Sequence, residues 1–182
     1  IWFHQVIGMP RVNPFYFPKQ HETILAFSKA GKKDLIFNSE AESVRRPFSD
    51  SVLNSAKLDS DGKLVYRRGR TGTLNPWAYD ERYLRTELDP QRGVLAADVW
   101  DEWKSYQPPP SEKAGFATQK PSSILERIIS ASSERDSLIA DFFCGSATTM
   151  AVAAKLGSRW IGAHPGRYAI HVSRKRLIQV QR

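Results

Sequence analysis

The sequence predicts an α/β fold, and three observations in its last third lead to this prediction. A short apolar run at 138–140, typical of a buried strand, ends at Asp141 and is followed by a turn rich in small residues. A helical pattern then ends at Gly157, and a second strand-like run covers 159–163. Strand, glycine turn, helix and strand form a βαβ unit, whose two strands pair in parallel through a right-handed crossover.

Two elements are expected earlier in the chain. A strand over 23–27 (Thr-Ile-Leu-Ala-Phe) follows a start that is rich in aromatic residues and prolines. A hairpin is predicted over 57–67, because Asp61 and Gly62 form a pair that tolerates the positive φ of a tight turn.

Three helices are expected after this hairpin. The first begins at Pro121, where Ser123 and Glu126 have the spacing of a capping box. Its apolar face is predicted to consist of Ile124, Leu125, Ile128 and Ile129. The second follows the small-residue turn, with an inner face of Ala147, Met150, Ala151 and Ala154. The third is a basic helix over 167–182.

Composition divides the chain into three zones. The 182 residues are 41% hydrophobic and 25% charged, which is ordinary for a globular protein. Residues 1–33 precede a polar, irregular zone at 34–116, and the periodic zone covers 117–182. Three prolines at 108–110 stiffen the chain near the second boundary.

The charge balance favours a polyanionic partner. Lys and Arg total 27 against 19 acidic residues, a net charge of +8, which suits nucleic acid but is also found in soluble basic proteins. A single cysteine excludes a disulfide framework within the chain and fits a reducing compartment. No apolar run approaches the ~20 residues of a membrane helix, and no secretory signal is evident, so a cytoplasmic location is expected. Because the first residue is Ile1 and not methionine, a processed or truncated piece of a longer chain is expected.

The βαβ unit predicts a ligand site beyond the carboxyl end of its first strand. Gly145 and its neighbours are small, so a ligand can approach the backbone closely, and Asp141 can accept a hydrogen bond. The amides that open the next helix can bind a carboxylate. A nucleoside site needs an acid about 20 residues further on, a position that falls at His164. The glycine patterns that bind dinucleotide and nucleotide phosphates are absent, which leaves a small ligand at a βα turn.

Several strings of residues together resemble a known family. They are Thr-Gln-Lys-Pro at 118–121, Leu-Glu-Arg-Ile-Ile at 125–129, Asp-Phe-Phe-Cys-Gly-Ser-Ala-Thr-Thr at 141–149 and Leu-Gly-Ser-Arg-Trp-Ile-Gly at 156–162. They closely resemble the amino-methylating DNA methyltransferases, and their order resembles the beta group, in which the cofactor-binding half follows the catalytic half. Residues 111–116 and 174–177 look like the modification subunits of type III restriction systems, and residues 21–29 resemble the strand that precedes target recognition in the family.

The resemblance implies a Rossmann-like methyltransferase sheet and S-adenosylmethionine as cofactor. Residues 1–33 would end the catalytic half, 34–116 would be the target-recognition region, and 117–182 the cofactor-binding half. The implied cofactor-binding residues are Thr118, Gln119, Lys120, Pro121, Asp141, Phe142, Phe143, Cys144, Gly145, Ser146, Ala147, Thr148 and His164. The implied contacts to DNA phosphates are Arg67, Arg68 and Arg70.

The chain departs from the family pattern within the cofactor motif. Phe142 stands where the family has proline, and Ala147 stands where it has a second glycine. If Ala147 needs a positive φ, the strain is about 1 kcal/mol. His164 stands for the acid that binds the ribose. A neutral imidazole has one acceptor, so the loss of a charged partner predicts about 10- to 150-fold weaker cofactor binding.

The catalytic motif of the family, Asp/Asn/Ser-Pro-Pro followed by an aromatic residue, is absent from the sequence. Asn13-Pro14-Phe15-Tyr16 comes nearest, which makes Asn13, Pro14 and Tyr16 weak catalytic candidates. This string lies only a few residues before His21, where the family has a helix and a further strand in between, so a proline-containing loop is favoured. We therefore expect this chain to be the carboxyl-terminal part of a methyltransferase and to be impaired in catalysis.

Other conspicuous residues have ordinary structural interpretations. Cys144 is expected to be a small buried side chain and not a nucleophile, and His21-Glu22 lacks the second histidine of a zinc helix, so no metal site is expected. Trp77, Trp100 and Trp103 are expected to anchor a small core, although they could stack on bases. Arg174, Lys175 and Arg176 are expected to cap and solvate the last helix.

Three functions remain open at this point. The first is S-adenosylmethionine-dependent DNA methylation, at N6 of adenine in preference to N4 of cytosine, by a truncated and impaired form. The second is a DNA-binding or assembly module without catalysis. The third is one half of a split methyltransferase. The expected partners are double-stranded DNA and either a chain with the missing catalytic motif or a restriction subunit.

Overall fold

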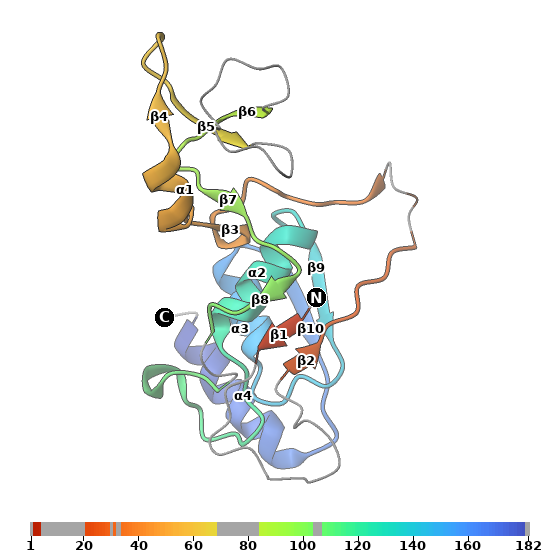
Figure 1. Ribbon diagram of the computed structural model, residues 1–182. Coiled ribbons are helices and arrows are strands. Elements are labelled where there is room, and N and C mark those ends of the chain that lie inside the picture. Colours follow the sequence, from red (N-terminus) through yellow and green to blue (C-terminus); the bar gives the residue numbers. More distant parts are fainter. Residues whose placement is uncertain are drawn as a thin grey trace, which may run out of the picture. The chain divides into compact units, whose positions relative to one another are not determined.

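The computed structural model describes most of the chain (Figure 1). The described residues are 2–4, 21–29, 31, 34–68, 84–103 and 107–180. They separate into two compact units, one of residues 1–44 with 96–182 and the other of residues 45–95. This second unit is shorter than the zone at 34–116 that composition indicated, because the residues on both sides of it pack within the first unit.

The predicted βαβ unit is present in the first unit. Strand β9 (Leu138–Asp141) leads through a turn into helix α3 (Thr148–Lys155), which is followed by strand β10 (Arg159–Gly162) (Figure 1). The two strands pair in parallel, with Leu138 opposite Arg159 and Asp141 opposite Gly162. Helix α2 (Ser122–Ser132) and helix α4 (Arg167–Val180) both pack against α3. The predicted order of elements and the parallel pairing are confirmed.

The core of this unit lies between α2, α3 and the strands. Buried Ile129, Val152 and Ala153 pack together and are covered by partly buried apolar side chains from both strands. The predicted inner face of α3 was wrong in part, because Val152 and Ala153 are buried whereas Ala154 is only half-buried. The strand at 138–141 is also not fully buried. Residues along it alternate between exposed and half-buried, and Leu138 is 58% exposed.

Helix α2 begins where the sequence predicted, but the capping box was wrong. Pro121 is the residue before the first turn, so the hydroxyl of Ser123 lies inside the helix and accepts a hydrogen bond from Trp103 Nε1 at 2.7 Å. The first backbone amide, that of Ser122, instead donates to Glu112 Oε2 at 2.9 Å. A carboxylate outside the helix therefore satisfies one of the amides that every helix leaves open at its start.

A buried arginine fastens α2 to distant residues. Arg127 donates to the Ser43 carbonyl at 2.7 Å and forms a two-pronged ion pair with Glu102, at 3.2 and 3.3 Å. Its guanidinium lies 5.0 Å from the ring centre of Trp100 and 4.4 Å from that of Trp103. These two tryptophans are packed as structural anchors, as expected, while Trp77 lies outside the described residues.

A second sheet of the first unit combines the start of the chain with a later segment. Strand β1 (Trp2–His4) pairs antiparallel with β2 (His21–Thr23) and parallel with β8 (Val99–Trp100). The strand predicted at 23–27 was therefore misplaced. Residues 24–27 are outside the strand. Ile24 packs against the cluster of Trp100 and Ile124, whereas Leu25 and Phe27 are 71% and 89% exposed.

Short 3₁₀ turns and a side-chain cap complete the first unit. The turns are η2 (Glu42–Val44) and η3 (Pro110–Glu112). Asn38 Nδ2 donates to the carbonyls of Ser130 and Ser133 at 2.9 and 2.8 Å, which caps the end of α2 from more than 90 residues away. No helix in the described ranges is long and apolar enough to cross a membrane.

In the described part of the second unit, strands are the main regular elements. Its elements are β3 (Arg45–Arg46), α1 (Asp50–Ser55), β4 (Lys57–Leu58), β5 (Leu64–Arg68), β6 (Leu84–Glu87) and β7 (Val94–Leu95). The predicted hairpin is confirmed, since β4 and β5 pair antiparallel around Gly62, whose φ is +73°. Strands β3 and β7 pair with each other, which brings the two ends of this unit together.

Candidate functional site

The turn between β9 and α3 lies at the carboxyl ends of both parallel strands. The Cys144 amide donates to the Ala163 carbonyl at 3.2 Å, and the Ala163 amide donates to the Asp141 carbonyl at 3.0 Å. These bonds join the turn to the residue that follows β10. The turn therefore occupies the position at which a βαβ unit binds its ligand.

Two residues of the turn have left-handed backbone. Gly145 has a φ of +50°, and Ala147, which is 0% exposed, has a φ of +62° and a ψ of +31°. The Ala147 amide donates to the Cys144 carbonyl at 2.7 Å, and its own carbonyl accepts from Ala151 at the start of α3. The condition for strain at Ala147 is therefore met, because its methyl group crowds the backbone at this φ.

Asp141 stabilises the turn from the end of the strand. Its Oδ1 accepts from the Phe143 amide at 3.0 Å, and its Oδ2 accepts from Thr149 Oγ1 at 2.7 Å. The carboxylate thus links the start of the turn to the first turn of α3. Phe142 and Phe143 project outward and are largely exposed.

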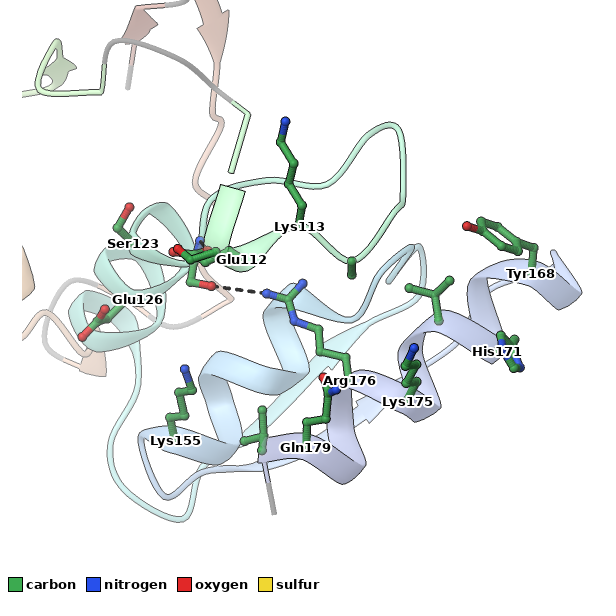
Figure 2. Close-up of a pocket in the computed structure, with 15 residues that line it drawn as sticks. Glu112, Lys113, Ser123, Glu126, Lys155, Tyr168, His171, Lys175, Arg176 and Gln179 are labelled. Carbon is green, nitrogen blue, oxygen red and sulfur yellow. Dashed lines mark hydrogen bonds between the residues drawn. The ribbon is translucent and has the colours of Figure 1, made fainter. Parts of the chain in front are cut away.

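Helix α4 supports the turn from the other side, which sequence reasoning missed. Arg176 Nη1 donates to Thr148 Oγ1 at 2.9 Å and lies 3.5 Å from Ser146 Oγ. Its Nη2 donates to Ser122 Oγ at 3.4 Å (Figure 2). Ser173 Oγ, one helical turn earlier, donates to the Gly145 carbonyl at 2.9 Å. The expectation that Arg176 is solvated was wrong, because it bridges three elements.

The environment of Arg176 affects its charge. Burial lowers the pKa of its guanidinium, and the nearby carboxylate of Glu112 acts in the opposite direction. Arginine keeps its proton over the whole physiological range even with a lowered pKa, so the bridge carries a positive charge. The signal available in the sequence was the i, i+3 spacing of Ser173 and Arg176, which places both on one helix face.

The segment at 118–121 lies next to the turn. The side chain of Gln119 is buried, accepts from the Ala114 amide at 2.8 Å and donates to the Glu112 carbonyl at 2.6 Å. The Lys120 carbonyl accepts from Thr148 Oγ1 at 3.5 Å. The two hydrogen bonds of Gln119 therefore fix the conformation of the loop at 112–119. Thr118 and Lys120 are exposed.

Three aromatic rings gather beside the turn. The ring of Phe116 lies against Gly145, where an added Cβ would come within 3.0 Å of its Cε1. It stacks on Tyr168 with 6.2 Å between the ring centres, and it meets His164 edge-on at 6.1 Å. His164 Nδ1 accepts from the Gly166 amide at 3.0 Å. Tyr168 was not singled out from the sequence.

Cys144 has the properties of a structural side chain. Burial raises the pKa of its thiol, and Asp141 adds to this rise, although the hydrogen bond with Ser173 opposes it. A neutral thiol is a poor nucleophile, which agrees with the expected packing role. In the described part of the chain, no group of three His, Cys, Asp or Glu side chains is placed to hold a metal ion.

Some predicted site residues are not covered by the structure. Asn13, Pro14 and Tyr16 lie outside the described residues, as does Arg70. Arg67 and Arg68 belong to β5 and pair with β6, but their side chains are not described. Their proposed contacts with DNA stay predictions.

Comparison with known proteins shows which family this chain is similar to. Residues 1–175 match the family model of the DNA methylases, of the N6 and N4 type. The chain is 48% identical over 129 residues to type II methyltransferase M2.DpnII of Streptococcus pneumoniae, covering 71% of this chain and 42% of that protein. It is 38% identical over 178 residues to DNA adenine methyltransferase YhdJ of Escherichia coli (strain K12), covering 97% and 50%.

Two further proteins are similar to parts of this chain. Type II methyltransferase M1.MboII of Moraxella bovis is 31% identical over 150 residues, covering 80% of this chain and 49% of that protein. A crystal structure of an M1.HpyAVI–SAM complex is 27% identical, with a TM-score of 0.38, and covers 42% of this chain and 40% of that one. The chain spans half or less of the length of each of these proteins.

The resemblance to type III modification subunits stays a prediction, since the relatives named above are type II enzymes and YhdJ. The family model matches nearly the whole sequence, and the small-residue turn that begins at Asp141 lies between β9 and α3. The chain therefore belongs to the family of amino DNA methylases, whose methyl donor is S-adenosylmethionine.

Proposed function

We propose that this chain binds S-adenosylmethionine at residues 141–149 and serves in methylation of DNA at N6 of adenine. The observation that carries the proposal is the turn at the carboxyl ends of β9 and β10, with left-handed backbone at Gly145 and Ala147. Adenine is preferred to cytosine because the relative that matches 97% of the chain is named an adenine methyltransferase.

The residues around the turn suit the parts of this cofactor. The amides that open α3 suit the carboxylate of its methionine portion. The rings of Phe116 and Tyr168 offer flat apolar surface for its adenine. When bound, the cofactor supplies a methyl group on a sulfonium, and the protein has to place that group beside the amino group of the base.

The ribose position is the weak part of this fit. Because His164 Nδ1 accepts from the Gly166 amide, the proton of a neutral ring lies on Nε2, and no ring acceptor remains for a ribose hydroxyl. We expect cofactor binding in the micromolar range or weaker. Calorimetric titration of the chain with S-adenosylmethionine tests this directly, and no binding at millimolar cofactor would refute the proposed site.

Catalysis by these 182 residues alone is expected to be severely impaired. The catalytic tetrapeptide of the family does not occur in the sequence, and a partner chain that carries it would complete the site. Purified chain is incubated with DNA and methyl-labelled cofactor, and little label should reach the DNA. Robust transfer would contradict this expectation, whereas transfer restored by a second chain would support the split form.

A DNA-binding or assembly module without catalysis is the second candidate. His164 favours it, because the ring nitrogen that could accept from a ribose hydroxyl already accepts from the Gly166 amide. Calorimetry and DNA titration separate the two proposals. DNA binding that depends on salt, together with no detectable cofactor binding, supports the module.

A further inference from the structure

Helix α4 has a composition that the cofactor site does not explain. Its 14 residues, Arg167–Val180, include Arg167, His171, Arg174, Lys175 and Arg176, and none is acidic. Helices that face only water usually mix both charge signs, because i, i+4 pairs of opposite charge stabilise them. Among these basic residues, Arg176 is the one that the described structure shows in contact with the turn region, through Thr148.

Two hollows flank this helix and share His171 and Lys175. The larger has a volume of about 880 Å³ and lies between α4, the start of α2 and the loop that carries Lys113 (Figure 2). The smaller, of about 430 Å³, is lined by Arg167, Ile170, His171, Arg174, Lys175 and Ile178. A basic track therefore runs across α4 from one hollow to the other.

The cations of this track are not neutralised by neighbours. Within the described ranges, the side chains of Lys113, Lys155, Arg174 and Lys175 form no ion pair or hydrogen bond. The carboxylates that line the larger hollow belong to Glu112 and Glu126, and Glu112 already accepts from the first amide of α2. Positive charge is in excess along the whole track.

We propose that this α4 surface, formed by Lys113, Lys155, Arg167, Arg174 and Lys175, binds the phosphate backbone of duplex DNA without reading its sequence. The proposal rests on the proposed function in one respect, namely that DNA is the substrate. Arg167 and Arg174 are separated by about 10 Å along the helix, roughly the rise of three nucleotides in one strand. Exposed lysines and arginines that meet phosphates release counterions, which stabilises binding to any DNA sequence.

The experiment compares two doubly substituted variants of the full chain. Arg174→Gln/Lys175→Gln removes two charges from the α4 surface. Lys29→Gln/Arg135→Gln removes two exposed charges elsewhere and serves as the matched control. Binding to a short duplex of arbitrary sequence is measured by fluorescence anisotropy between 50 and 200 mM salt, and thermal melting verifies that both variants fold.

The expected result is a change in the salt dependence. The slope of log K against log salt should fall by about 1.8 in the α4 variant, so its loss of affinity over this salt range should be about tenfold smaller than that of the control. The charge-preserving variant Arg174→Lys/Lys175→Arg should keep the original slope. Equal slopes for the α4 variant and the control would overturn the proposal. Equal slopes are also expected if the surface binds an acidic protein in place of DNA.

Cofactor titration distinguishes this result from failure of the proposed function. Both variants should bind S-adenosylmethionine as the unsubstituted chain does, because none of their substituted residues touches the turn. If the chain binds no cofactor but the slope still falls in the α4 variant, the methylase proposal fails while the DNA surface stands.

Discussion

Ala147 concentrates the strain of the candidate site in one residue. A left-handed φ costs an L-residue about 1–2 kcal/mol, whereas glycine adopts it freely. Ala147→Gly should therefore raise the free energy of unfolding by up to about 1 kcal/mol, after subtraction of the entropy that glycine gains in the unfolded chain. Urea unfolding measures this change.

Ala151→Gly is the matched control for this substitution. Ala151 is also buried but lies within α3, where glycine should lower the free energy of unfolding by about 1 kcal/mol. If both glycine variants destabilise the chain equally, then strain at Ala147 is refuted.

In the proposed site, His164 is expected to limit the affinity for the ribose of the cofactor. His164→Asp keeps an acceptor for the Gly166 amide two residues on, and it adds a carboxylate oxygen for a ribose hydroxyl. We expect S-adenosylmethionine to bind about 10- to 150-fold more tightly. Calorimetry gives the dissociation constant, with His171→Asp on α4 as a control that should leave it unchanged. Unaltered affinity in the His164 variant would place the ribose elsewhere.

At the scale of elements, Arg176 positions the start of α3 against the start of α2. Arg176→Met removes its bonds to Thr148 and Ser122, and loss of these partly buried hydrogen bonds should cost about 1–3 kcal/mol of stability. Cofactor binding should weaken as well, because the turn loses its support. Arg174→Met on the exposed face is the control.

A conservative variant separates positioning from packing. Arg176→Lys keeps the charge and one donor, so it should restore part of the cofactor affinity that the methionine variant loses. A positioning role would be contradicted if cofactor affinity stays unchanged in both variants. It would also be contradicted if the loss of affinity in each variant simply matches its loss of stability.

Arg127 is the equivalent fastening for α2. Arg127→Met removes the guanidinium and leaves Glu102 without this ion-pair partner. Because the Glu102 carboxylate is 31% exposed, the loss of stability should be smaller than for a fully buried pair. We expect a loss of about 2–4 kcal/mol. Urea unfolding measures the loss. The double variant Arg127→Met/Glu102→Gln should recover part of it. A loss below about 0.5 kcal/mol would show that the ion pair is only a surface contact.

At the scale of the whole molecule, the unit at 45–95 has the form of an insertion. The Ala96 amide donates to the Val44 carbonyl at 3.0 Å, so the two residues that bracket this unit are adjacent. Replacement of 45–95 by a short Gly-Ser linker should therefore leave the βαβ unit folded.

The shortened chain also tests whether residues 45–95, which form most of the expected target-recognition region at 34–116, carry any sequence preference. It should bind S-adenosylmethionine unchanged and keep salt-dependent binding to arbitrary DNA through the α4 surface. Any preference for one DNA sequence should disappear, as measured by competition between duplexes. A sequence preference that survives would contradict target recognition by 45–95.

The elements that follow from local patterns were the ones that could be predicted. The hairpin at Gly62 and the parallel pair β9 and β10 depend on turn residues and on apolar runs a few residues long. The strand expected at 23–27 failed for the same reason, since its partner β1 and the core that decides its bounds lie elsewhere in the chain.

The order strand, small-residue turn, helix and strand, and with it the membership in the DNA methylases, was determined by the sequence alone, because both depend on residues that are neighbours in the chain. Only the tertiary structure decided which groups support that turn. Ser173 and Arg176 reach it from a helix more than 20 residues further along the chain, and Ala147 takes its left-handed φ within their packing. Contacts at such separation depend on how whole elements pack, which no local pattern specifies.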